Sequence, residues 1–182
     1  MKVLEAKLKG CFVVEPKIFK DERGYFFESF NSKKFQDITQ SKTNFVQDNE
    51  SYSTKGVLRG LHYQIGDYAQ AKLVRVVKGK VLDVTVDLRK DSETFGEHIS
   101  VELTEENKKQ FFVPKGFAHG FIVLSDTAIF SYKCDNFYNK ESEQGIIYND
   151  KDLNIDWQLP ESEFIVSEKD TILPTFKNAI LP

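Results

Sequence analysis

Apolar and polar residues alternate along much of the chain in short runs, which is the pattern of half-buried β-strands. The run 80–87, KVLDVTVD, places Leu82, Val84 and Val86 on one face of a strand, because successive side chains of a strand point to opposite faces. The run 98–103, HISVEL, alternates in the same way. Segments this rich in valine, isoleucine and leucine normally bury at least one face, so these runs predict the core of a β-sheet protein.

Turn residues separate further runs of this kind, and helical periodicity is almost absent. We expect strands within residues 1–20 (two short strands broken at Gly10), 25–30, 44–54, 56–64, 71–78, 80–87, 98–103, 110–113, 119–124 and 128–134. The stretch 44–54 should pass from strand into a polar loop, and Ser32 should cap one short helix that ends near Ile38. Residues 143–182 are less regular, with Trp157 and Phe164 as apolar anchors. Many short strands joined by turns predict an antiparallel sandwich or barrel, in a single domain over residues 1–182.

The stretch 56–83 combines this apolar character with several titratable side chains, namely Arg59, His62, Lys72, Arg75 and Asp83. Charged groups inside apolar strands must be paired, reach the surface or line a cleft, and their concentration in one stretch favours a cleft. Arg59 and His62 are three residues apart, so a regular strand would send them to opposite faces. Both can serve one cleft only if the strand has a bulge near Gly60 or if Arg59 reaches round the sheet edge.

Composition argues against several broad classes of function. A chain of 182 residues with 16 phenylalanines and 40% hydrophobic residues is long and apolar enough to bury a core. Acidic and basic residues are interspersed and the net charge is −3, which argues against nucleic-acid binding but permits a local basic pocket. No apolar run approaches the ~20 residues of a membrane span, and the amino terminus has no signal-peptide pattern. Cys11 and Cys134 match no metal-ligand spacing, so we expect reduced thiols in a cytoplasmic protein.

The motif Pro114-x-Gly116-x-x-His119 lies between two predicted strands, and it resembles the second motif of the cupin superfamily, whose fold is a jelly roll. Metal-binding cupins carry a His-x-His pair and a glutamate on an earlier strand. The corresponding place reads His62-Tyr63-Gln64 here, so the second histidine is missing. The third histidine of the chain, His98, lies on a strand face expected to be solvated, and no carboxylate has the spacing to complete a metal triad. We therefore expect no metal cofactor.

His62, Lys72 and Tyr132 are the candidates for acid–base chemistry. Histidine is suited to proton abstraction near neutral pH, and a lysine can stabilise an oxyanion that forms beside it. Alternation places Tyr132 on the same strand face as Phe130 and Cys134, from which its hydroxyl could donate a proton across a cavity. Taken singly, such residues are more often a hydrogen-bonded core histidine, a core tyrosine and a lysine that reaches solvent, so the residue types alone leave both interpretations open.

Ordered motifs extend over nearly the whole chain. They are Asp21-x-Arg23-Gly24-x-Phe26-x-Glu28, Gln47-x-Asn49, GVLRGLHYQ at 56–64, Lys72-Leu-Val-Arg75, Val81-x-Asp83-Val84, Val86-Asp-Leu-Arg89, Ser92-x-Thr94-Phe95-Gly96, Pro114-x-Gly-Phe-Ala-His-Gly-Phe121, Tyr132-Lys-Cys134, Tyr138, Glu143-x-Gly145, Asn149-Asp150 and Ser167-x-Lys169-Asp170. In this set of motifs the chain resembles the dTDP-4-dehydrorhamnose 3,5-epimerases, which are cofactor-free cupins of dTDP-L-rhamnose biosynthesis. The resemblance implies a mainly β, cupin-type jelly roll (double-stranded β-helix) with a few short helices, and an isomerase that needs no cofactor.

The resemblance also implies roles for individual residues. The implied catalytic residues are His62 as general base, Asp170 as the group that orients it, Tyr132 as the opposing proton donor, Lys72 as the enolate-stabilising cation, and Asp83 paired with His119 behind the 4-keto oxygen. The residues implied to hold the nucleotide sugar are Arg23, Phe26, Glu28, Gln47, Asn49, Arg59, Tyr138, Glu143 and Lys169. Family members are usually homodimers that exchange strands, so a homodimer is implied as well.

The implied substrate is dTDP-4-dehydro-6-deoxy-D-glucose, and the implied product is dTDP-4-dehydro-L-rhamnose. The C4 ketone acidifies the hydrogens on C3 and C5, so a base can remove each of them, and an acid on the other face of the sugar can return a proton with inversion. Two alternatives stay open: a 3-epimerase of the same fold, and a non-catalytic cupin that binds a nucleotide sugar. The chain departs from the family at Ile65-Gly66-Asp67-Tyr68, where prolines are usual, and this loop is expected at the cavity rim.

Overall fold

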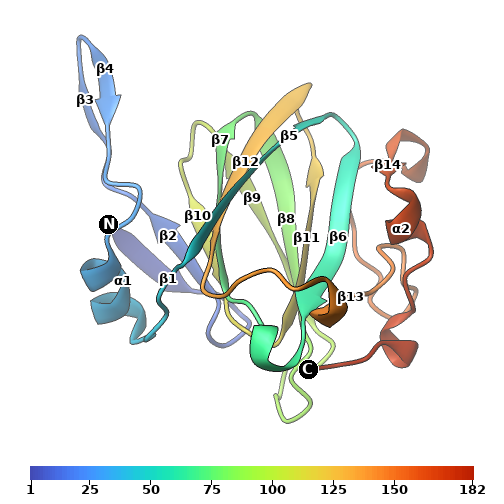
Figure 1. Cartoon of the computed structure of the whole chain (residues 1–182). Helices are drawn as coiled ribbons and strands as arrows, with labels where there is room; N and C mark the ends of the chain where they lie inside the picture. The colour runs from blue at the N-terminus through green and yellow to red at the C-terminus, as the bar shows by residue number, and fades with distance from the viewer.

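Two antiparallel sheets face each other in the computed structural model, which describes residues 1–182 (Figure 1). The first sheet has the order β1 (Lys2–Glu5), β2 (Phe12–Glu15), β10 (Gln110–Val113), β7 (Lys72–Lys78), β12 (Thr127–Cys134) and β5 (Gln47–Thr54). The second has the order β13 (Glu143–Gly145), β6 (Val57–Gln64), β11 (Phe117–Val123), β8 (Lys80–Asp87) and β9 (His98–Thr104). The short strand β14 (Ile165–Val166) adds to β6 in parallel. This architecture is the jelly roll that the family resemblance implies, and it agrees with the antiparallel sandwich or barrel expected from the strand pattern.

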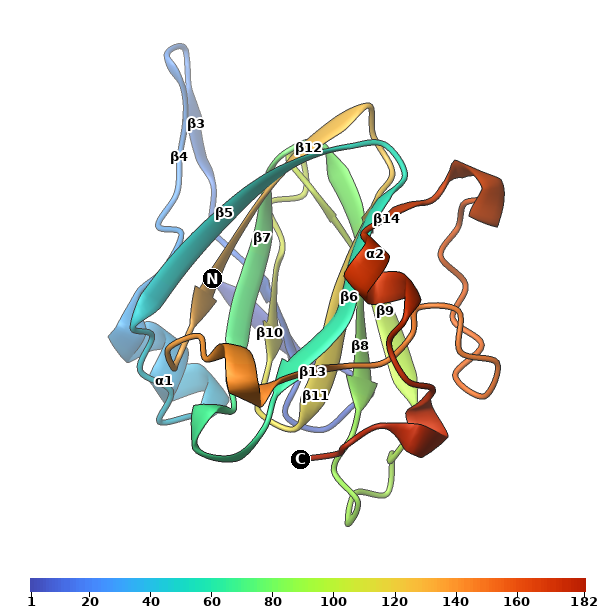
Figure 2. The same ribbon diagram turned by 45° about the vertical axis from the view of Figure 1, so that its right-hand side comes forward.

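The remaining elements lie outside the two sheets. β3 (Phe19–Asp21) and β4 (Gly24–Phe26) form a hairpin, called the arm below, which projects away from the barrel at the upper left of Figure 1. Helix α1 (Ser32–Thr39) follows the arm, and the short helix α2 (Glu168–Thr171) lies beside β6 (Figure 2). Single turns of 3₁₀-helix are η1 (Gly66–Tyr68), η2 (Lys140–Ser142), η3 (Glu161–Glu163) and η4 (Phe176–Asn178). None of the helices has the length and apolar character needed to cross a membrane.

Three local expectations differ from the structure. The strand expected over residues 25–30 ends at Phe26, because the chain then leaves the arm so that Phe30 can pack on Phe35, with ring centroids 5.9 Å apart. The polar run 47–54 is not a loop but β5 itself, because all of its residues pair with β12. Helix α1 is capped by Asn31, whose side-chain oxygen accepts a hydrogen bond from the amide of Lys34, and not by Ser32.

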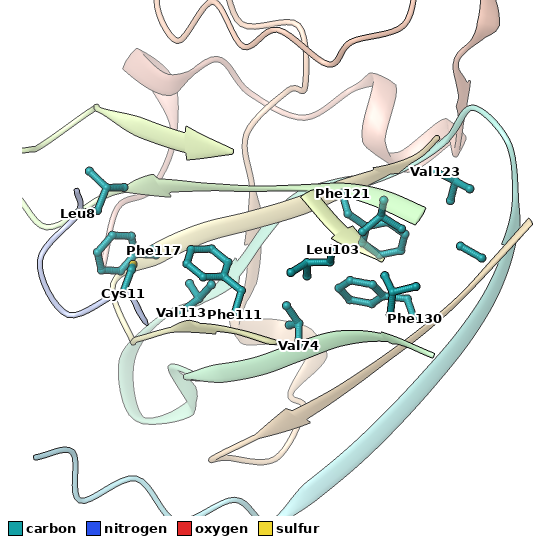
Figure 3. Packing of buried hydrophobic residues seen from close by; sticks show 13 residues of the cluster. Leu8, Cys11, Val74, Leu103, Phe111, Val113, Phe117, Phe121, Val123 and Phe130 are labelled. Carbon is teal, nitrogen blue, oxygen red and sulfur yellow. The ribbon is translucent and has the colours of Figure 1, made fainter. Parts of the chain in front are cut away.

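A cluster of 13 buried side chains fills the space between the sheets (Figure 3). Phe121 of β11 and Phe130 of β12 stack with their ring centroids 4.1 Å apart, so they join one sheet to the other. A second cluster covers the outer face of the second sheet, where Leu82 packs under residues 146–182, called the C-terminal segment below. Trp157 is buried in this second cluster and Phe164 packs against it, which confirms both predicted anchors.

Strand β6 contains a bulge where it pairs with β11. His62 lies opposite His119 and Arg59 lies opposite Phe121, so β6 advances three residues while β11 advances two. Gly60 sits in this bulge with φ of +132°, and a Cβ there would approach a backbone carbon of β11 to 2.6 Å, so the position requires glycine. The extra residue shifts the alternation of side chains along β6, so Arg59 and His62 line the same cleft. This is the first of the two possibilities that the three-residue spacing left open.

Candidate active site

A cleft lies between β5 and β12 of the first sheet and β6 and β11 of the second, and residues of α2 form part of its wall. It has two sections that share His62, Lys72 and Tyr132. The larger section, about 570 Å³, extends past Arg59 and is called the Arg59 section below. The smaller section, about 310 Å³, extends to Tyr138 and is called the Tyr138 section. The three candidates for acid–base chemistry therefore lie together where the two sections meet.

His62 and Asp170 form a pair, although they are far apart in the sequence. His62 Nε2 lies 2.7 Å from Asp170 Oδ1, and the Asp170 carboxylate is almost fully buried. Burial favours a higher pKa for Asp170, but hydrogen bonds from His62, the Gly60 amide and Ser167 outweigh it and hold that pKa below its ordinary value. An ionised carboxylate only accepts hydrogen bonds, so Nε2 carries a proton, and in the neutral imidazole the free lone pair is on Nδ1. Such a nitrogen is suited to act as a base.

Tyr132 faces the cleft from the other sheet. It lies on β12 in the first sheet, whereas His62 lies on β6 in the second, and both line the same cavity. Its ring packs near Phe130, with ring centroids 5.9 Å apart. Burial is the main reason that the pKa of Tyr132 is raised above its ordinary value. The phenol therefore keeps its proton at neutral pH and is available as a donor.

A second group of charged side chains lies beside this pair. His119 Nε2 is 2.9 Å from both carboxylate oxygens of Asp83, which is completely buried. Burial raises the pKa of Asp83 above its ordinary value, although His119 and Lys72 oppose the effect. Burial also lowers the pKa of Lys72. Lys72 and His119 both line the cleft, and a protonated lysine and an imidazole at such a place are groups that stabilise a developing oxyanion.

Four of the predicted substrate-binding residues line the Tyr138 section, and Lys169 of the Arg59 section joins them in one connected group. Gln47 Nε2 donates to Asn49 Oδ1 (3.1 Å), and Gln47 Oε1 accepts from the backbone amide of Tyr138 (3.2 Å). The Tyr138 hydroxyl donates to Glu143 Oε2 (3.2 Å), and Lys169 Nζ lies 3.3 Å from both oxygens of the same carboxylate. This end of the cleft thus offers amide, carboxylate, ammonium and aromatic groups at its edge.

Arg59 lies in the other section. Its Nε and Nη2 donate to the hydroxyl of Ser53 at 3.3 and 3.2 Å, and its guanidinium forms no ion pair with a carboxylate. Ser51 lines the same section and was not among the predicted site residues. The signal that could have found it is the two-residue spacing of Gln47, Asn49, Ser51 and Ser53, which places all four on the inward face of β5.

Arg23, Phe26 and Glu28 are not brought to the cleft of their own chain. Arg23 is paired with Asp21 in the arm, Phe26 is 70% exposed, and Glu28 lies 2.8 Å from Lys34 Nζ near helix α1. The reason is the direction of the arm, which leads away from the barrel (Figure 1).

Gln64, which stands where metal-binding cupins have a second histidine, holds two loops together. Its Nε2 donates to the carbonyls of Tyr68 (2.7 Å) and Phe137 (3.2 Å), and its Oε1 accepts from the amide of Asn139 (2.7 Å). The buried side-chain amide of Gln64 therefore joins the loop 65–68 to the loop 137–139. No group of three His, Cys, Asp or Glu side chains in the structure is placed to hold a metal ion.

A jelly roll with groups for proton transfer in its cleft defines the chain as a cupin-type isomerase. Residues 5–178 match the family described as dTDP-4-dehydrorhamnose 3,5-epimerase. The chain belongs to this dTDP-4-dehydrorhamnose 3,5-epimerase family.

Known relatives share nearly the full length of the chain. A crystal structure of dTDP-4-dehydrorhamnose 3,5-epimerase from Elizabethkingia anophelis is 60% identical, covers 98% of this chain and 97% of its own, and superposes with a TM-score of 0.95. The 3,5-epimerase from Legionella pneumophila, solved in complex with dTDP-4-keto-L-rhamnose, is 48% identical with a TM-score of 0.93 and coverages of 97% and 93%. The dTDP-4-dehydrorhamnose 3,5-epimerase of Shigella flexneri is 55% identical over 170 residues, or 93% of each chain.

Proposed function

We propose that this chain inverts C3 and C5 of dTDP-4-dehydro-6-deoxy-D-glucose to give dTDP-4-dehydro-L-rhamnose, in dTDP-L-rhamnose biosynthesis. The observation that carries the proposal is the placement of His62 and Tyr132 on facing sheets, at the junction of the two cleft sections. Inversion through deprotonation needs a base on one face of the sugar and an acid on the other. A cupin that only bound a nucleotide sugar would not need this pair.

In the proposed reaction, Nδ1 of His62 removes the hydrogen from C3 or C5 as a proton. The electrons of the broken C–H bond pass to the C4 carbonyl and leave an enolate whose charge sits on oxygen. The Tyr132 hydroxyl then returns a proton to the carbon from the opposite face, which inverts the centre. Exchange with solvent then removes the proton from His62 and returns one to Tyr132, after which the same residues repeat these steps at the second carbon. Each proton-transfer partner typically contributes about 10²- to 10⁴-fold in rate.

Lys72 and His119 are proposed to stabilise the enolate oxygen. His119 is fixed by Asp83, and Lys72 lies in both sections of the cleft, at the level of the base and the acid. Oxyanion stabilisation by one preorganised donor is worth about 3 kcal/mol, so this group contributes on the same scale as a proton-transfer partner. The nucleotide part is proposed to bind through Gln47, Asn49, Arg59, Tyr138, Glu143 and Lys169.

We also propose a homodimer in which each arm reaches the cleft of the partner. The arm projects from its own barrel and exposes aromatic rings, with Phe19 52% and Phe26 70% exposed. Apolar surface of this kind on a protruding hairpin is typical of an interface. Arg23, Phe26 and Glu28 would then complete the binding site of the other protomer.

Mixing two inactive variants tests this dimer. Arg23→Ala and His62→Ala should each lose activity, but dimers mixed from the two chains should regain roughly a quarter of wild-type activity, because each mixed dimer contains one complete site. Activity is measured after unfolding and refolding the two variants together. A double Arg23→Ala/His62→Ala variant mixed with either one is the control that should stay inactive. Failure of the mixture to recover would contradict arm exchange.

We further propose a cytoplasmic enzyme, an assignment supported by two free, buried cysteines.

Exhaustive chelation with EDTA is expected to leave turnover unchanged, because Gln64 occupies the place of a histidine ligand and its side chain already forms hydrogen bonds with three backbone groups. Metal content by mass spectrometry and activity are measured on the same sample. Stoichiometric zinc or iron whose removal stops turnover would contradict this expectation.

Incubation with dTDP-4-keto-6-deoxyglucose in deuterated water tests the function directly. Proton NMR should show deuterium at both C3 and C5 together with the signals of the inverted sugar. Deuterium and inversion at C3 alone would identify the 3-epimerase instead. Binding without any exchange would identify a nucleotide-sugar-binding module.

A further inference from the structure

We infer that Ser51 is a further substrate-binding residue, whose hydroxyl forms a hydrogen bond with an oxygen of the hexosyl diphosphate beside Arg59; this inference rests on the proposed function. Ser51 lies on β5 opposite Phe130 of β12 and lines the Arg59 section of the cleft. Its Oγ is shielded from solvent and has no hydrogen-bond partner in the protein. A buried hydroxyl of this kind carries an uncompensated desolvation cost.

The Ser51 hydroxyl differs from the other buried side-chain polar atoms of the protein in having no partner of any kind. Only one other buried side-chain polar atom lacks a hydrogen bond, Glu97 Oε2, and it lies 2.7 Å from Lys7 Nζ, so its charge is paired. Ser51 is therefore the one side chain lining the cleft whose buried polar atom has neither a hydrogen bond nor a charged partner.

The neighbours of Ser51 indicate the chemistry of that ligand. Ser51 and Ser53 are two residues apart and share the inward face of β5, and Ser53 accepts hydrogen bonds from Nε and Nη2 of Arg59. The guanidinium keeps further N–H groups and has no carboxylate partner. A cation without a counter-ion next to an unpaired hydroxyl matches an oxygen-rich group, either a phosphoryl oxygen or a hydroxyl of the hexose. In this arrangement Ser51 contacts the substrate and Ser53 is a positioning residue for Arg59.

The inference predicts opposite effects of one substitution on binding and on stability. Ser51→Ala should raise the KM for the nucleotide sugar with a much smaller change in kcat. The expected rise is about ten- to a hundredfold for a hydrogen bond to a charged phosphoryl oxygen and about two- to tenfold for one to a hexose hydroxyl. The melting temperature of the ligand-free variant should stay the same or rise, because the substitution removes a buried group that has no partner. A merely structural hydroxyl would show the reverse, namely a lower melting temperature with KM unchanged.

The experiment compares Ser51→Ala with Ser100→Ala, an exposed serine on β9 that serves as the matched control. Steady-state kinetics give KM and kcat, and calorimetric titration gives the affinity for dTDP, which lacks the hexose. An equal loss for dTDP and for the substrate places the contact on the diphosphate, and a loss for the substrate alone places it on the hexose. Unchanged KM and unchanged dTDP affinity in Ser51→Ala would overturn the role of Ser51. That result, obtained with an active wild type, leaves the proposed function standing, whereas an inactive wild type would overturn the function itself.

Discussion

His62→Ala is expected to abolish deuterium incorporation at both C3 and C5, with a loss of about 10²- to 10⁴-fold in exchange rate. One imidazole serves both carbons in the proposed reaction, so both exchange rates should fall together. In the proposed reaction the nitrogen that acts is Nδ1, because Nε2 lies 2.7 Å from the Asp170 carboxylate and donates its proton there. NMR of the substrate in deuterated water measures the two rates separately.

Asp170→Asn provides the graded comparison for this prediction. The amide keeps the shape of the carboxylate but removes its charge and can offer N–H instead of oxygen to Nε2, so the tautomer of His62 is no longer enforced. Exchange should fall by less than in His62→Ala and at both carbons alike. Circular dichroism should show the wild-type fold in both variants. Wild-type exchange rates in folded His62→Ala would remove this residue from the mechanism.

Tyr132→Phe should separate proton removal from inversion. The substitution deletes only the hydroxyl and keeps the ring that packs near Phe130. Substrate binding and proton removal by His62 should persist, whereas delivery of a proton from the opposite face should fall about 10²- to 10⁴-fold. The expected NMR result is deuterium wash-in with retained configuration, or inversion of a single centre.

Tyr52→Phe is the matched control for Tyr132→Phe. Tyr52 lies on the neighbouring strand β5, where it points outward and is 61% exposed. This control should epimerise both centres at wild-type rates. Unchanged double inversion in Tyr132→Phe as well would mean that the second proton comes from another donor, such as water.

The sequence predicted the parts of the fold that depend on local alternation. The run 80–87 placed Leu82, Val84 and Val86 on one face, and the structure buries that face under the C-terminal segment. The polar run 47–54 was harder, because its strand character comes from pairing with β12 and not from apolar residues of its own. The three-residue spacing of Arg59 and His62 left two possibilities, a bulge near Gly60 or an Arg59 side chain that reaches round the sheet edge. The structure has the bulge, and the close approach of β6 and β11 at Gly60 fixes its position in the ladder.

The site residues also fall into those that the sequence could predict and those that it could not. His62, Lys72 and Tyr132 were candidates from residue type and strand parity, and the pairing of His62 with Asp170, 108 residues away, came only from the family resemblance. No local pattern could show that the arm turns away from its own cleft and takes Arg23 with it, because the direction of a hairpin depends on packing beyond it. Ser51 was hidden for another reason: a serine in a polar run has no distinguishing mark until its hydroxyl is seen to lack a partner.

The origin of Asp170 in the C-terminal segment has a consequence for how activity is lost. This carboxylate reaches the cleft on α2, a helix of four residues that follows the two-residue strand β14. The barrel owes its cohesion to the cluster between the sheets, so a local opening of residues 165–171 leaves the sheets intact while His62 loses the group that fixes its proton. Activity therefore depends on whether the C-terminal segment is packed against the barrel, and it can be lost while the barrel stays folded. Mild denaturant, or a protease that cleaves the C-terminal segment, should abolish activity under conditions in which the barrel is still folded.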